Sequence, residues 1–143
     1  MSEHLLWERI RGGMGPRWHA QRHEDKYSKG IPDVSYGCRG KDGWIELKYL
    51  EKEPALKSRR WDFRYDHFTA EQRNWMSSRL QWGSGRIFVL AQIGETVYLW
   101  RWRSLKELLG NHTFEYIRAG ACGTWRPTID YGQLIDLLTN RYT

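Results

Sequence analysis

The sequence predicts an α/β fold, in which a central mixed β-sheet is flanked by helices. Residues 86–93 form a nearly continuous apolar run, as in a central strand that is buried on both faces. The clearest helical pattern, at residues 69–82, separates that run from an earlier strand pattern at 44–50. The chain has 143 residues without repeats, low-complexity tracts or Pro/Ser-rich linkers, so we expect a single domain over residues 1–143.

The first part of the chain is predicted to hold one short helix and three strands. Leu5, Leu6 and Ile10 recur at the spacing of one helical face, and the glycine pair at 12–13 follows them. This pattern favours a short helix that ends at the glycines. Alternation over 18–24 predicts a strand, and a second short strand covers 33–37. The Asp-Gly pair at 42–43 indicates a turn that introduces the third strand, at 44–50.

A long loop and a capped helix follow. Residues 51–67 are charged and aromatic without periodicity, and a loop of this length is usually functional or disordered. Thr69 and Gln72 are three residues apart and form a capping box, which begins the helix at 69–82. Gln72 shares one helical face with Trp75 and Met76, so we expect that face to lie on the sheet.

The C-terminal part is predicted to complete the sheet and to add two helices. The buried strand at 86–93 turns at a Gly-Glu pair into a hairpin partner at 96–102. Ser104 is expected to cap a short helix. A last helix covers about residues 131–140.

Composition excludes several classes of protein and favours a polyanionic partner. No apolar run reaches the roughly 18 residues that span a bilayer, and the N-terminus lacks a signal-peptide pattern, so no membrane partner is expected. Cys38 and Cys122 have no CxxC spacing, and we expect free thiols in the reducing cytoplasm. The net charge is +6, and 16 of the 23 basic residues are Arg, whose guanidinium binds phosphate oxygens bidentately.

Aromatic residues interleave with these basic residues. Nine Trp and eight Tyr are present, and the segments 57–65 and 100–103 alternate cations with rings. Such interleaving is typical of a nucleic-acid surface. The alternative is that the aromatic residues form core and that the Arg stems cover apolar surface while their head groups stay in water.

Three charged side chains are arranged as in a phosphodiester-hydrolysing site. Asp33 follows a Gly-x-Pro bend, and Glu46 and Lys48 lie thirteen and fifteen residues further on. Side chains two apart on a strand share a face, so Trp44, Glu46 and Lys48 point the same way. Converging carboxylates need a cation between them, and their oxygens suit Mg²⁺, with Mn²⁺ as a substitute. The alternative for Glu46 and Lys48 is a solvated strand face with a cross-strand ion pair.

Two further polar residues extend this constellation. Glu24 closes the predicted strand before Asp33 and offers a third carboxylate; its alternative role is an ion pair with Arg22 or Lys26. Gln72 is polar yet lies on the sheet-facing side of its helix. Its alternative role is the capping box alone.

Four segments, in this order, resemble the PD-(D/E)xK nuclease superfamily. They are Arg22-His-Glu24, Gly30-Ile-Pro-Asp-Val34, Gly43-Trp-Ile-Glu-Leu-Lys-Tyr49 and His67-Phe-Thr-Ala-Glu-Gln-Arg-Asn-Trp75. More narrowly, they look like the VRR-NUC type and its phage-encoded relatives, which are similar to Holliday-junction resolvases. The resemblance covers about residues 18–93 and fades towards the C-terminus.

The resemblance implies a restriction-endonuclease-like core and divalent-metal-dependent cleavage of DNA. Carried over by position, Asp33 and Glu46 are metal ligands, Glu24 is the upstream carboxylate, and Lys48 is the catalytic lysine. Gln72 matches the glutamine on the helix after the strand and is expected to position the lysine or the substrate. Glu24 departs from the family pattern because its segment reads as a strand, whereas the upstream acid often lies on the first helix.

These observations predict a Mg²⁺-dependent DNA endonuclease that acts on branched or structured DNA, as a homodimer. The side chains expected to contact the DNA backbone are Lys57, Arg59, Arg60 and Arg64, and Trp61 is expected to stack on unpaired bases with Phe63 and Tyr65. Alternatively, this loop packs on the protein's own surface. The alternative functions are a non-catalytic DNA-binding module or accessory subunit, and a nickase or single-strand nuclease.

Overall fold

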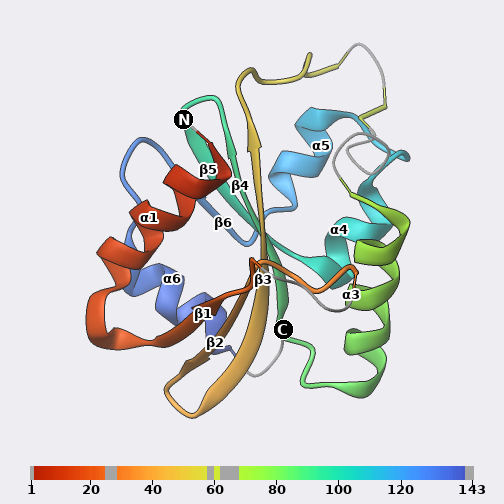
Figure 1. Cartoon of the computed structure of the whole chain (residues 1–143). Coiled ribbons are helices and arrows are strands. Elements are labelled where there is room, and N and C mark those ends of the chain that lie inside the picture. The colour runs from red at the N-terminus through yellow and green to blue at the C-terminus, as the bar shows by residue number, and fades with distance from the viewer. Residues whose placement is uncertain (1, 25–28, 58–59, 62–67, 141–143) are drawn as a thin grey trace.

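The computed structural model describes residues 2–24, 29–57, 60–61 and 68–140 (Figure 1). Within these residues, six strands form one sheet in the order β1-β2-β3-β4-β5-β6, and helices cover both of its faces. This arrangement confirms the predicted α/β fold with a central mixed sheet. The elements are α1 (Glu3–Met14), a 3₁₀ turn (Gly15–Arg17), β1 (His19–Arg22), β2 (Val34–Cys38), β3 (Lys41–Leu50), α3 (Ala70–Trp82), β4 (Ile87–Ile93), β5 (Thr96–Arg101), α4 (Trp102–Leu108), α5 (Phe114–Ala119), β6 (Gly123–Trp125) and α6 (Tyr131–Leu138).

Strands β3 and β4 form the parallel pair of the sheet, and the other neighbouring strands run antiparallel. Parallel strands need a crossover connection, and α3 lies on the crossover between β3 and β4. Helix α3 lies against the face of the sheet to which Trp44 and Lys48 of β3 point, since these side chains contact Trp75 and Gln72 of α3. This placement brings the predicted helix face near the predicted Glu-x-Lys strand.

Two hydrophobic cores lie on opposite faces of the sheet. Helices α1 and α6 cover one face, where Ile10 and Leu138 are fully buried. Helices α3, α4 and α5 cover the other face with the buried side chains of Met76, Leu105 and Phe114. Every residue of β4 is buried, because this strand contributes alternate side chains to both cores, as the apolar run predicted.

The predicted turn at Asp42-Gly43 is wrong. Cys38 pairs with Lys41, so the hairpin turns at Arg39-Gly40, and both of these residues have positive φ, 50° and 76°. Two-residue loops of this kind match the right-handed twist of the flanking strands. Gly43 lies inside β3, where a Cβ atom would overlap the ring of Tyr36.

The C-terminal helices differ from expectation at two places. The prediction that Ser104 caps a helix is wrong, because α4 begins at Trp102 and Arg101 precedes it without a side-chain cap. Helix α5 and strand β6 were not predicted at all. The last helix, α6, matches its expected position. None of the helices in the described part of the chain combines the length and apolar character that crossing a membrane requires.

Candidate active site

The backbone brings Asp33 next to Glu46. Val34 begins β2 and pairs with Ile45 of β3, so Asp33 and Glu46 lie opposite each other just beyond the paired residues. The backbone N–H of Asp33 donates to Glu46 Oε1 at 3.2 Å. In return, the Asp33 carboxylate accepts the Leu47 N–H at its Oδ2 atom, at 2.8 Å. These two hydrogen bonds hold the Asp33 carboxylate against β3.

Gly30 fixes the bend that leads to Asp33. Its φ is 90°, and a Cβ atom there would overlap the backbone of Glu71 and come within 2.9 Å of the Gln72 nitrogen. The bend therefore rests on the first turn of α3, at a distance that only glycine allows. Through this contact the segment carrying Asp33 and the helix carrying Gln72 are packed directly together.

Lys48 lies at the centre of the group. Its Nζ is 3.0 Å from Glu46 Oε2 and donates to Gln72 Oε1 at 3.5 Å. The ring of Phe68 lies below the ammonium, with its centroid 4.7 Å from Nζ, in a cation–π contact. Only 6% of Lys48 and 1% of Glu46 is exposed, so the charges interact in a poorly hydrated environment.

Gln72 has two structural roles. Thr69 and Gln72 form the predicted capping box, in which the Thr69 N–H donates to Gln72 Oε1 at 3.0 Å and the Gln72 N–H donates to Thr69 Oγ1 at 3.1 Å. The same Oε1 atom accepts from Lys48. The sequence left open whether Gln72 caps the helix or contacts the lysine, and in the structure it does both.

The pKa of Glu46 is raised to about 8, and burial is the largest cause. The negative charge of Asp33 and a hydrogen bond with it also raise this pKa, and the ammonium of Lys48 lowers it without compensating for burial. A divalent cation at the two carboxylates would favour their ionised forms. Two carboxylates with hard oxygen donors fit Mg²⁺, which is usually held by one or two carboxylates together with water and substrate phosphate.

Glu24 does not form a three-carboxylate group with this pair among the described residues. It is exposed and follows β1 by two residues. Among the residues that the structure describes, no three His, Cys, Asp or Glu side chains come together as a metal site. Glu24 therefore does not join Asp33 and Glu46 in this arrangement.

The predicted DNA-binding loop is described only in part, because Arg59 and Arg64, like Phe63 and Tyr65, lie outside the described residues. The Lys57 Nζ lies 3.7 Å from a carboxylate oxygen of Glu115. Arg60 is exposed, and its backbone forms a β-bridge with Thr113. Trp61 packs edge-on against Phe114, with ring centroids 4.7 Å apart, so for this residue the structure shows the alternative of packing on the protein's own surface.

Sequence reasoning missed one aromatic contribution to this face of the sheet and placed another. Phe68 was not singled out, because nothing in its neighbourhood signals a contact with Lys48. Trp44 precedes Glu46 by two residues, and the structure has it on the expected face, against Trp75 of α3. Trp44 stacks on His23 with centroids 5.5 Å apart and meets Trp75 edge-on at 4.8 Å.

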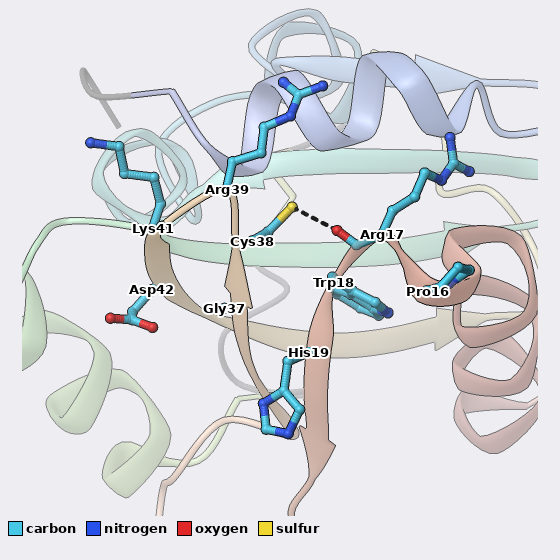
Figure 2. A pocket seen from close by; sticks show the side chains of 10 residues that line it. Pro16, Arg17, Trp18, His19, Gly37, Cys38, Arg39, Lys41 and Asp42 are labelled. Carbon is cyan, nitrogen blue, oxygen red and sulfur yellow. Dashed lines mark hydrogen bonds between the residues drawn. The ribbon is translucent and has the colours of Figure 1, made fainter.

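A separate hollow of about 490 Å³ lies at the β2–β3 hairpin (Figure 2). Two of its three Arg and Lys side chains already have partners: Arg17 donates to the Gly13 carbonyl at 2.7 Å, and Arg39 pairs with Asp136 at 2.7 Å, while Lys41 also lines the hollow. Figure 2 shows both guanidinium groups pointing away from His19. Cys38 lines this hollow as a free thiol whose pKa is raised by burial, and its Sγ donates to the Arg17 carbonyl. These groups therefore do not converge on a ligand.

Comparison with solved structures finds a similar protein. It is Hjc, a Holliday junction resolvase from the archaeal hyperthermophile Archaeoglobus fulgidus, at 13% sequence identity and a TM-score of 0.50. The alignment covers 82% of this chain and 88% of the resolvase chain. The two proteins share a fold. No family model and no curated protein matches the sequence.

The likeness to Hjc bears on the family resemblance only at the level of the fold. It confirms the nuclease-like fold that the PD-(D/E)xK motifs implied. The narrower likeness to VRR-NUC proteins, the phage origin and the roles of individual residues stay predictions.

Proposed function

We propose that this protein is a divalent-metal-dependent DNA endonuclease that acts on branched or structured DNA. One observation carries the proposal: Asp33, Glu46 and Lys48 are buried and connected to one another and to the half-buried Gln72, and these four residues come from three separate segments of the chain. A solvated strand face with a surface ion pair would not bury these charges. The fold of an archaeal Holliday junction resolvase supports branched DNA as the substrate.

In this proposal Asp33 and Glu46 hold Mg²⁺, which Mn²⁺ replaces. Such an ion, when bound, lowers the pKa of a water molecule and stabilises charge on the phosphate oxygens. Lys48 orients the attacking water or neutralises negative charge that develops on the phosphate. Gln72 positions the ammonium of Lys48 by accepting its hydrogen bond. Glu24 is left out of the proposed ligand set because it forms no three-carboxylate group with Asp33 and Glu46 among the described residues.

The test is a cleavage assay on linear duplex, single-stranded, flap and four-way-junction DNA with Mg²⁺, Mn²⁺ or EDTA. We expect cleavage of the branched substrates in both metals and none in EDTA. Lys48→Ala and Asp33→Asn are expected to lower the rate by at least about 100-fold, the lower range of a general acid–base or charge-stabilising contribution. Arg11→Ala, an exposed arginine on α1 across the sheet, is the matched control.

Each arm has an outcome that opposes the proposal. DNA binding without cleavage in any metal would favour the non-catalytic alternative. Cleavage restricted to one strand, or to single-stranded DNA, would favour the nickase or single-strand nuclease. Wild-type rates in the Lys48→Ala and Asp33→Asn variants would mean that the active site lies elsewhere.

Lys57 and Arg60 are proposed to contact the DNA backbone, as the sequence predicted. Both side chains are exposed on the side of the sheet that carries the candidate site. Replacing both by alanine should weaken binding to every DNA sequence and make its salt dependence shallower, by about 0.9 in the log–log slope for each lost phosphate contact. An unchanged salt dependence of DNA binding would show that Lys57 and Arg60 do not contact the DNA backbone.

A further inference from the structure

Helix α3 carries a stripe of side chains that begins at the candidate active site. Gln72, Trp75, Arg79 and Trp82, here called the α3 stripe, are spaced by three, four and three residues, so they lie along one side of the helix. Gln72 contacts Lys48 and so belongs to the site itself. At a rise of 1.5 Å per residue, the stripe extends about 15 Å from Gln72 to Trp82.

Arg79 lies in the middle of the stripe beside two tryptophan rings. Its guanidinium carbon lies 4.6 Å from the ring centroid of Trp75 and 5.4 Å from that of Trp44. Its stem lies against the helix end, since a Cβ atom on Gly83 would come within 2.6 Å of Arg79 Cδ. With the described residues Arg79 forms ring contacts but no ion pair, so the edges of its guanidinium are available to an anion.

A hollow of about 330 Å³ lies beside this guanidinium. Arg79 and Trp44 line it on one side, and His19, Gln21 and Ser35 contribute polar groups from β1 and β2. Asp42 is the only carboxylate on the described lining. The hollow thus offers hydrogen-bond donors and the guanidinium of Arg79 on the same face of the sheet as Lys48.

Trp82 ends the stripe as a free-standing indole. It is 81% exposed, whereas the other eight tryptophans in the described residues are buried or half-buried. An exposed indole next to a stacked arginine offers a flat apolar face beside a positive charge. Bases stack on such faces whatever their sequence, while a cation binds the adjoining phosphate.

We propose that the α3 stripe binds an unpaired stretch of DNA strand that leads away from the cleaved bond. Arg79 binds a phosphate of that stretch, and Trp82 stacks on an unpaired base. A span of about 15 Å corresponds to about four nucleotides at the 3.4 Å spacing of one strand. This inference rests on the proposed action on DNA. It adds that the substrate contains an unpaired stretch of strand, which a fully paired duplex lacks.

The test measures binding in EDTA, where no cleavage occurs. Fluorescence anisotropy compares a labelled duplex with the same duplex extended by a five-nucleotide single-stranded tail. We expect Trp82→Ala to weaken binding of the tailed DNA by roughly 5- to 150-fold, the range for stacking of one base, and to leave duplex binding unchanged. Trp82→Phe should retain most of the affinity, because the ring still stacks.

A second readout reports stacking directly. The fluorescence of 2-aminopurine at an unpaired position of the tail should fall on binding to wild type and to Trp82→Phe, but not on binding to Trp82→Ala. Arg79→Ala should make the salt slope for the tailed DNA shallower by about 0.7. Leu5→Ala and Arg11→Ala, which remove an exposed apolar and an exposed basic side chain from α1, are the matched controls.

Several outcomes separate this inference from the proposed function. Cleavage in Mg²⁺ by wild type, together with equal binding of tailed DNA by wild type and Trp82→Ala, would overturn the inference alone. Binding of the tail through Trp82 without cleavage in any metal would uphold the inference and overturn the nuclease. If Trp82→Ala instead changed the chain from dimer to monomer, the indole would be a subunit contact and the inference would be wrong.

Discussion

Glu46 combines a buried carboxylate with two charged neighbours of opposite sign. Its pKa of about 8 in the folded protein lies above the ordinary value of 4.5. Between these two pH values the folded state holds a proton on Glu46 that the unfolded chain has released. The free energy of unfolding of the metal-free protein therefore falls as pH rises through this window.

This pH dependence gives a prediction for Glu46→Gln. Because the amide does not titrate, the variant should lose less stability than wild type between pH 5 and pH 8, and the two slopes should differ by at most about 1.4 kcal/mol per pH unit. Urea unfolding in EDTA at several pH values measures both slopes. Parallel slopes would mean that Glu46 is already ionised in the metal-free fold.

Metal affinity should have the opposite pH dependence in wild type. The ion binds the ionised carboxylate, so binding displaces the proton of Glu46 and tightens as pH rises towards 8. Titration calorimetry with Mn²⁺ in buffers of different ionisation enthalpy detects the released proton. The Glu46→Gln variant, which has lost one proposed ligand, is the control.

Single residues also mark how far the sequence predicts the site. The two-residue periodicity of a strand was enough to place Glu46 and Lys48 together, and the Gly-x-Pro bend placed Asp33. Glu24 is a carboxylate that could bind a metal, but it follows the end of β1, so strand periodicity does not predict where its side chain lies. Phe68 contacts Lys48 only because the folded chain brings these distant residues together, so no local spacing in the sequence predicts the contact.

At the level of elements, helix α3 ties local stability to the candidate site, and two alanine variants separate these contributions. Thr69→Ala removes half of the capping box and should cost about 0.5–2 kcal/mol of stability, while the contact between Lys48 and Gln72 remains. Gln72→Ala should cost a similar amount and also lower cleavage by roughly 10- to 150-fold, the equivalent of one hydrogen bond to a charged group. Melting temperatures and cleavage rates of both variants test this.

Equal cleavage losses in the two variants would show that Gln72 acts only through the helix cap. Gln72→Glu offers a further comparison, because a glutamate at this position can still cap the helix and accept from Lys48. It should melt close to wild type. Retained cleavage in this variant would identify the acceptor oxygen, rather than the amide, as the part of Gln72 that matters.

Elements were predictable where periodicity had room to develop. The thirteen residues of α3 and the seven buried residues of β4 were found at their expected places. Helix α5 has only six residues and β6 only three, which is too short for a pattern. Their stability comes from packing, as the burial of Phe114, Ile117 and Trp125 shows.

At the scale of the whole molecule, the sheet separates two differently used faces. On the α1/α6 side, exposed cations are engaged by carboxylates, as in the pairs of Arg11 with Glu8 and of Arg39 with Asp136. On the α3 side Lys48 pairs with Glu46 and Lys57 with Glu115, whereas the exposed Arg79 forms ring contacts but no ion pair with the described residues. A polyanion is therefore expected to approach the α3 side, and one protein molecule presents one candidate site to it.

The single site per chain leads to the prediction of a homodimer. A symmetric junction needs two cuts, which a two-fold pair of chains supplies simply. Sedimentation equilibrium at micromolar concentration is expected to give twice the chain mass of 17.2 kDa. Mixed dimers of wild type and Asp33→Asn should cut only one strand of a junction, whereas a monomer in the presence of junction DNA would contradict the prediction.

The contact between Gly30 and the backbone of α3 has a kinetic consequence. It joins the segment that delivers Asp33 to the helix turn that holds Lys48 through Gln72. Both halves of the site are thereby oriented when the chain folds, before any DNA arrives. If the proposed cleavage occurs at this site, these groups are oriented during folding, and little reorganisation of them is expected when the phosphodiester bond breaks.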